Sequence, residues 1–133
     1  MADKPSYVVV AFSPQPSLAY FLKGVLDCAG LTTIACSSSV AEIEDMAERI
    51  HPDAIVYDVS YPFAENWQQL QQLRTRPALQ TTPFVITTSE ARELFRRVGY
   101  SGAIELFARP SDLSAFQHAV RSAIEKDAPG FAA

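Results

Sequence analysis

A carboxylate, two hydroxyls and a guanidinium each stand directly after a short apolar run of this sequence. They belong to Asp58, to Thr88 and Ser89, and to Arg109. A carboxylate beside a guanidinium can form an ion pair, and it supplies one of the several oxygens that Mg²⁺ requires. An Asp that ends a strand is also commonly a turn-former or a helix N-cap, and hydroxyls there often bond the backbone. Their chemistry therefore depends on which of them the fold brings together.

Five apolar, β-branched runs have the length of strands buried on both faces. They cover residues 7–11, 32–36, 54–57, 83–87 and 103–107. Between these runs apolar residues recur at helical spacing, and strict alternation of this kind predicts an α/β fold with a parallel sheet and helices on both faces. In open sheets of this type, sites lie beyond the carboxyl ends of the strands, where the four polar residues stand.

The composition is that of one ordinary globular domain. The chain has 133 residues, of which 48% are hydrophobic and 20% charged, with a net charge of −4. We expect one domain over residues 1–126, with 127–133 as a tail or truncated linker. The acidic balance argues against nucleic-acid binding, and neither a secretory leader nor a membrane-spanning run is recognisable. These features predict a cytoplasmic protein, with Cys28 and Cys36 as buried free thiols rather than a disulfide.

Particular residues make the chain resemble the receiver domain of two-component response regulators. Asp58 is followed by Pro62 four positions later, and Arg109 by Pro110. The resemblance implies a flavodoxin-like (βα)5 sandwich with strand order 2-1-3-4-5. It also implies Asp58 as the phosphoacceptor, with Thr88 and Ser89 contacting the phosphoryl group and Arg109 in place of the family's lysine.

Two positions depart from the receiver pattern. The family's two Mg²⁺-binding acids fall on Ser13 and Pro14, or on Phe12 and Ser13 in the neighbouring register, and neither pair contains a carboxylate. We therefore expect weak Mg²⁺ binding at most, no other cofactor, and Asp58 held by Arg109 in an ion pair. The family's switch aromatic falls on Leu106, which lacks a hydroxyl.

The favoured function is that of a degenerate receiver, a pseudo-receiver that is not an enzyme and acts by binding proteins. Its partners would be a histidine kinase, an output domain of its own or another regulator. The family's usual interaction face predicts a possible homodimer through helix four, strand five and helix five. This face would include Glu93, Arg96, Arg97, Glu105 and residues of 112–126. Two alternatives remain: a conventional receiver phosphorylated on Asp58 and, less favoured, a flavodoxin-like FMN binder. The segment 12–17 has two prolines and no glycine, which suits phosphate binding poorly.

Overall fold

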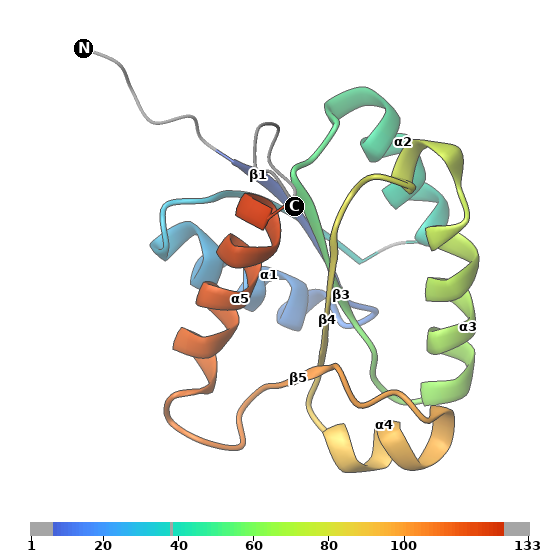
Figure 1. Ribbon diagram of the computed structural model, residues 1–133, viewed down its shortest axis with the longest axis vertical. Helices are drawn as coiled ribbons and strands as arrows, with labels where there is room; N and C mark the ends of the chain where they lie inside the picture. The colour runs from blue at the N-terminus through green and yellow to red at the C-terminus, as the bar shows by residue number, and fades with distance from the viewer. Residues whose placement is uncertain (1–6, 38, 127–133) are drawn as a thin grey trace.

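Five parallel strands form one sheet in the order β2-β1-β3-β4-β5, which confirms the predicted fold class and strand order (Figure 1). The computed structural model describes residues 7–37 and 39–126, so the predicted tail at 127–133 lies outside the described residues. The strands are β1 (Val8–Phe12), β2 (Thr32–Cys36), β3 (Ala54–Asp58), β4 (Phe84–Thr88) and β5 (Ile104–Glu105).

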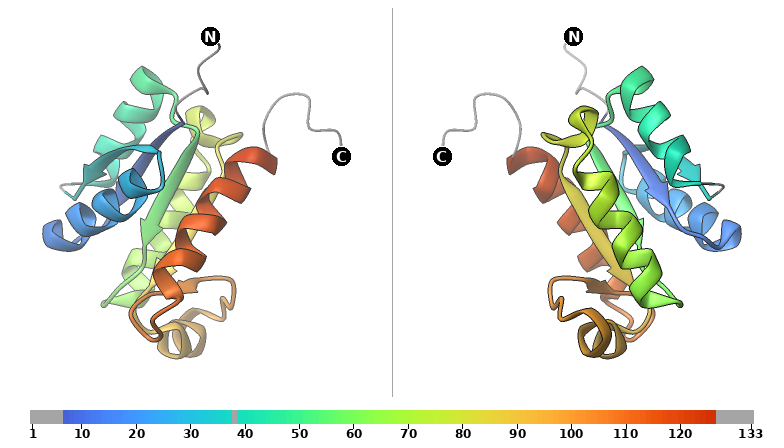
Figure 2. Two further views of the ribbon diagram at one scale, coloured as in Figure 1. Left: turned by 90° about the vertical axis from the view of Figure 1, so that its left-hand side faces the viewer. Right: turned by 90° about the vertical axis from the view of Figure 1, so that its right-hand side faces the viewer.

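Helices cover both faces of the sheet (Figure 2). They are α1 (Pro16–Cys28), α2 (Val40–Ile50), α3 (Phe63–Arg74), α4 (Ala91–Val98) and α5 (Asp112–Lys126), with a short 3₁₀ turn, η1 (Pro77–Leu79), before β4. Helices α1 and α5 lie on one face, and α2 and α3 lie on the other. Because all the strand pairs are parallel, the carboxyl ends of the five strands lie at one edge of the sheet.

The core is two apolar layers, one on each side of the sheet. Alternate residues of β3 belong to different layers, because successive strand side chains point to opposite faces. Val56 packs beneath α1 and α5, whereas Ile55 and Tyr57 pack beneath α2 and α3. All five residues of β3 are buried, as expected for a central parallel strand. The last of them is Asp58, so the core itself positions this carboxylate.

Strand β5 is shorter than the predicted run over 103–107, because it comprises only Ile104 and Glu105. The backbone N–H of Leu106 still donates to Thr88 O at 2.9 Å. Phe107 then adopts a left-handed conformation with φ of 70°, which a bulky side chain rarely takes. Because of this conformation at Phe107, the hydrogen bonding to β4 ends with Leu106.

No disulfide joins Cys28 and Cys36, so the disulfide alternative is wrong. Cys36 is buried at the end of β2, as predicted. Cys28 is exposed, contrary to the prediction, because it is the last residue of α1 and lies outside the apolar stripe that carries Leu22 and Leu26.

Candidate functional site

Asp58 lies at the carboxyl end of β3, at the centre of the sheet edge, and is only 1% exposed. Its Oδ1 atom accepts a hydrogen bond from Thr87 Oγ1 at 3.0 Å, and its Oδ2 atom accepts a long one from Ser13 Oγ at 3.5 Å. Thr87 comes from the neighbouring strand β4, and Ser13 directly follows β1. Among the described residues, the partners of this buried carboxylate are therefore hydroxyls.

The hydroxyl that contacts Asp58 is that of Thr87, whereas Thr88, the residue predicted to contact a phosphoryl group on Asp58, does not bond the carboxylate. Asp58 and Thr87 are direct register partners between β3 and β4. Thr88 is the next residue along the strand, and its Oγ1 accepts from the backbone N–H of Glu90 at 3.2 Å. Two adjacent threonines look equivalent in a sequence, and only strand pairing decides which of them points toward the carboxylate.

Arg109 does not contact Asp58, so the predicted ion pair between them is also wrong. Arg109 Nε lies 3.2 Å from Asp112 Oδ1, and its side chain is 77% exposed. Asp112 is buried, and its Oδ2 accepts from the backbone N–H groups of Ala108 and Arg109 at 2.9 and 2.7 Å. These backbone hydrogen bonds, of which that of Arg109 has the largest effect, hold the pKa of Asp112 below its ordinary value. Asp112 thus binds the backbone of the loop before α5 and also pairs with the guanidinium of Arg109.

Burial raises the pKa of the Asp58 carboxyl to about 6, because a charged group is poorly solvated there. The hydroxyls of Thr87, Ser13 and Ser60, in that order, lower the pKa and so limit the rise. Ser60 is 6% exposed, and its Oγ has no well-formed hydrogen bond to any described residue. Next to Asp58, burial and the carboxylate charge raise the pKa of Tyr57 to about 12. The site is a desolvated carboxylate surrounded by neutral oxygens.

The positions at which receiver domains carry their two Mg²⁺-binding acids have different surroundings in this structure. Ser13 is fully buried against Asp58, whereas Pro14 is exposed and lines a different cavity. Phe12, the other candidate, stacks on Tyr57 in the core with ring centroids 4.8 Å apart. Within residues 7–37 and 39–126, His, Cys, Asp and Glu side chains form no group of three or more that could hold a metal ion. One carboxylate with hydroxyls fits Mg²⁺ poorly, because this ion favours several charged or strongly polar oxygens in octahedral geometry.

Leu106 and Phe107 take different environments at the end of β5. Leu106 is 1% exposed in the apolar layer that contains Phe116 and Val120. Phe107 is 56% exposed, and its ring lies 5.4 Å from that of Phe21 on α1. A strand that continued through residue 107 would place Phe107 on the face opposite to that of Leu106. The αL conformation, which the sequence does not reveal, brings the two rings together.

A cavity of about 320 Å³ opens beside this aromatic pair at the same edge of the sheet. Its lining comes from α1 and from the segments after β1, β3, β4 and β5. The lining residues are Gln15, Ser17, Leu18, Phe21, Ser60, Ser89 and Phe107. The predicted Ser89 therefore belongs to the site region, whereas Ser60 and Gln15 are additions from the structure.

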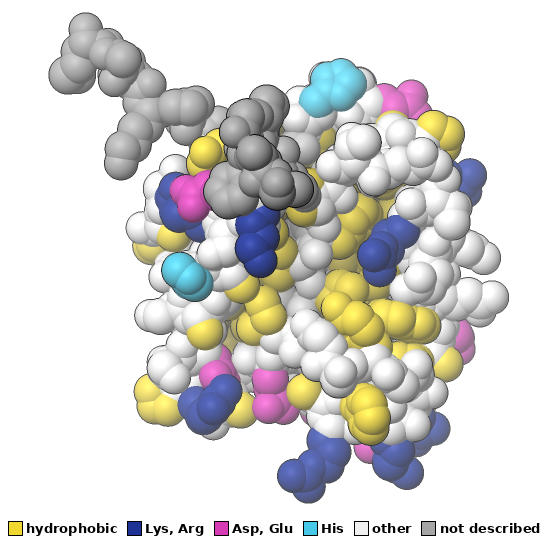
Figure 3. All heavy atoms as spheres, in the orientation of Figure 1, with side chains coloured by type: hydrophobic (Ala, Val, Ile, Leu, Met, Phe, Trp, Pro, Cys, Tyr) yellow, Lys and Arg dark blue, Asp and Glu magenta, His cyan; other side chains and the backbone are white. Residues whose placement is uncertain are grey.

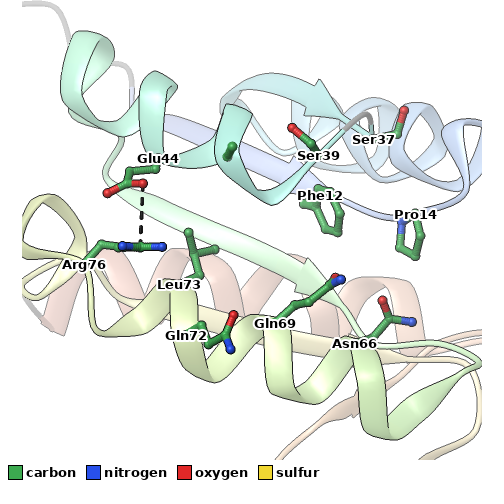
Figure 4. Close-up of a pocket in the computed structure, with 11 residues that line it drawn as sticks. Phe12, Pro14, Ser37, Ser39, Glu44, Asn66, Gln69, Gln72, Leu73 and Arg76 are labelled. Atoms are coloured by element: carbon green, nitrogen blue, oxygen red, sulfur yellow. Dashed lines mark ion pairs between the residues drawn. The ribbon is translucent and has the colours of Figure 1, made fainter.

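A larger cavity, of about 580 Å³, lies between α2 and α3 (Figure 4). Gln69 and Gln72 project toward it from α3, and the ion pair between Arg76 Nε and Glu44 Oε1, at 3.7 Å, stands at one end. Of the candidate positions for the missing acids, Phe12 and Pro14 line this cavity, whereas Asp58, Thr88, Ser89 and Arg109 do not. It is therefore separate from the Asp58 site.

The basic side chains are dispersed over the surface that Figure 3 shows. Figure 3 shows Lys and Arg at separate places on one face, with a group over α4. In α4, Glu93 forms ion pairs with Arg96 at 2.7 Å and with Arg97 at 2.8 Å. These pairs neutralise part of the group, so it offers little free positive charge for a phosphate backbone. None of the helices in the described part of the chain is long and apolar enough to cross a membrane.

The chain has the fold of CheY-like response regulator receiver domains. It resembles a sensor protein from Polaromonas sp. JS666 with a TM-score of 0.74 and 18% identity, over 93% of this chain and 100% of that one. Chemotaxis protein CheY4 of Vibrio cholerae gives a TM-score of 0.64 and 20% identity, over 87% and 99%. A response regulator from Thermotoga maritima gives 0.67 and 16%, over 91% and 99%. No protein-family model and no curated protein matches the sequence.

Proposed function

We propose that this chain is a degenerate receiver domain of two-component signalling, which acts by binding a protein and not by Mg²⁺-dependent phosphoryl transfer. The receiver fold and Asp58 at the end of β3 support the class. The degenerate function is supported by the hydrogen-bond partners of Asp58, which are the hydroxyls of Ser13 and Thr87. Phosphoryl transfer to an Asp would instead need a metal ion and a cationic side chain at these positions. On this proposal the domain is not an enzyme and holds no cofactor.

The proposed partners are a histidine kinase, an output domain or another regulator. The surface formed by α4, β5 and α5 is the proposed contact face, and a homodimer through it is part of the proposal. Phe95 on α4 is 54% exposed there, beside the charged Glu93, Arg96 and Arg97. An exposed aromatic ring within a polar rim is typical of interaction sites.

The test is incubation with acetyl phosphate and Mg²⁺, followed by intact-mass measurement. The proposal expects no added phosphoryl group on the wild-type chain. A gain of one phosphoryl group that Asp58→Ala abolishes would instead establish the conventional receiver. Glu105→Ala is the matched control, because it also removes one carboxylate, on β5, but leaves Asp58 in place.

One observation favours the conventional receiver as a second candidate. Thr87 directs its hydroxyl at Asp58 from the register-paired position, so a hydroxyl is ready to contact an added oxygen. That function would require another source for the metal's oxygens, such as backbone carbonyls and water. Isothermal titration with MgCl₂ separates the two candidates, because the degenerate receiver should give no saturable heat.

A further inference from the structure

The cavity between α2 and α3 presents accessible polar side chains to a ligand (Figure 4). Its volume of about 580 Å³ lies within the range of small-molecule sites, about 300–1,000 Å³. Gln69 and Gln72 project toward it from α3, and both residues are exposed. Their side-chain amides have no hydrogen-bond partner among the described residues. Both amides are therefore free to bond a molecule in the cavity.

A loose ion pair stands at one end of this cavity. Arg76 Nε lies 3.7 Å from Glu44 Oε1, which is longer than a hydrogen bond, and the two side chains are 53% and 30% exposed. Within the described part of the chain, neither side chain makes a hydrogen bond or a second ion pair. An exposed pair of this length contributes little to stability. The guanidinium and the carboxylate can therefore each bond a ligand at little cost.

The charges of the lining select the kind of ligand. Arg76 and Glu44 are the only charged side chains among the described residues that line the cavity. An anion would bond Arg76 but meet the negative charge of Glu44, and a cation would meet the reverse. A ligand that carries a carboxylate and an ammonium group side by side satisfies both residues.

The rest of the lining favours an uncharged body with polar groups. Leu73 lies next to the ion pair, and Gln69 and Phe12 lie further along the cavity (Figure 4). Leu73 and Phe12 are almost fully buried and belong to the apolar core, so they give the cavity an apolar floor. The amides of Gln69 and Gln72 stand beside this floor. A short alkyl chain that ends in an uncharged polar group matches this surface.

We propose that this cavity binds a free α-amino acid with an uncharged polar side chain. The carboxylate of the ligand accepts hydrogen bonds from the guanidinium of Arg76, and its ammonium group donates to the carboxylate of Glu44. Its side chain lies over Leu73 and bonds the amides of Gln69 and Gln72. The inference goes beyond the proposed function and does not rest on it, because Asp58 is not part of this cavity.

The test is a titration with L-glutamine at pH 6.5, followed by NMR of the backbone amides. Saturable shifts are expected at residues 44, 69, 72 and 76. Nα-acetyl-L-glutamine lacks the ammonium group and L-glutaminamide lacks the carboxylate, so each should bind more weakly by about tenfold. Equal binding of either analogue, or no saturation up to about 50 mM L-glutamine, would overturn the proposal.

Variants of the ion pair assign each charged group of the ligand. Arg76→Gln should weaken L-glutamine binding several-fold without weakening that of L-glutaminamide, which has no carboxylate. Glu44→Gln should weaken L-glutamine binding similarly without weakening that of Nα-acetyl-L-glutamine. Arg74→Gln and Glu48→Gln are the matched controls, because Arg74 lies over the Phe84 ring and neither residue lines the cavity. Unchanged L-glutamine affinity in both Arg76→Gln and Glu44→Gln would refute the site.

Two further probes test the class of the ligand. L-Norleucine has the same zwitterionic group but no side-chain amide, so it should bind more weakly than L-glutamine. Cytidine presents an uncharged edge of donors and acceptors and should also bind more weakly. Binding of either probe as tight as that of L-glutamine would contradict the proposed class. None of these results depends on the outcome of the acetyl phosphate test, because the phosphoacceptor candidate Asp58 lies outside the cavity.

Discussion

Thr87 and Asp58 face each other across neighbouring strands, with 3.0 Å between Thr87 Oγ1 and Asp58 Oδ1. Both side chains are buried, so the hydrogen bond forms in a region of low dielectric, where it stabilises the charged carboxylate more than it would in water. Among the hydroxyls that lower the pKa of Asp58, that of Thr87 has the largest effect.

Thr87→Val removes this hydroxyl with little change of shape. The pKa of Asp58 should rise above its value of about 6, because burial then acts with less compensation. The measurement is a ¹³C NMR titration of the Asp58 carboxyl. Thr88→Val is the matched control and should leave that pKa unchanged, since Thr88 bonds the Glu90 N–H. A larger change of pKa in the Thr88 variant would contradict the register described above.

Asp58 should make stability depend on pH in a direction opposite to that of most acidic residues. Its folded-state pKa, about 6, lies above the ordinary value of 3.8, so the folded state binds the proton more tightly than the unfolded state. Stability should therefore fall as pH rises from about 4 to about 6, and the loss is complete above that range.

Asp58→Asn should remove this loss of stability at high pH, because Asn does not ionise. At pH 8 the variant should be more stable than wild type by an amount on the order of 3 kcal/mol, because the pKa of Asp58 is higher by about two in the folded state than in the unfolded state. Below pH 4 the advantage should vanish. Urea unfolding at both pH values provides the measurement, and an advantage that persists unchanged at pH 4 would show that titration of Asp58 is not its cause.

Ser13→Asp should create the second carboxylate that a divalent ion requires, because Ser13 is buried within 3.5 Å of Asp58 Oδ2. Wild-type thermal stability should be insensitive to 10 mM MgCl₂, whereas the variant should be stabilised by the ion and bind it at least about tenfold more tightly. Pro14→Asp is the control, since Pro14 is exposed and faces another cavity. If Mg²⁺ stabilised the Pro14→Asp variant but not the Ser13→Asp variant, the missing acid would belong at position 14 and not at position 13.

Phe107 should be the site of local backbone strain, because its φ of 70° is unfavourable for a side chain with a Cβ atom. Phe107→Gly and Phe107→Ala both remove the ring contact with Phe21, but only glycine relieves the strain. The glycine variant should therefore be more stable than the alanine variant by about 1 kcal/mol. Thermal or urea unfolding of the pair measures this, and the reverse order would show that Phe107 is unstrained.

Asp112→Asn should destabilise the domain more than Arg109→Ala, because Asp112 is buried and accepts two backbone N–H groups while Arg109 is mostly exposed. The pKa of Asp112 is lowered in the folded state. Its contribution to stability is therefore present above the ordinary pKa of aspartate and lost as pH falls below it. Comparison of melting temperatures at pH 7 and pH 3 should show the difference between the two variants shrinking at the lower pH.

Much of the architecture was predictable because it follows from short-range patterns. Alternating apolar runs and helical stripes predicted five strands, five helices and a parallel sheet, since each element must bury its apolar face. The lack of carboxylates at residues 12–14 was equally visible in the sequence. So was the single acid that ends the central strand, Asp58.

Which side chains meet was decided by tertiary structure. Strand register, set by pairing between β3 and β4, selected Thr87 over the adjacent Thr88. Arg109 has a long side chain with several possible partners, and its proximity to buried Asp112 decided among them. The exposure of Phe107 follows from one backbone dihedral angle. These outcomes depend on distances between segments far apart in the chain, which local residue patterns do not encode.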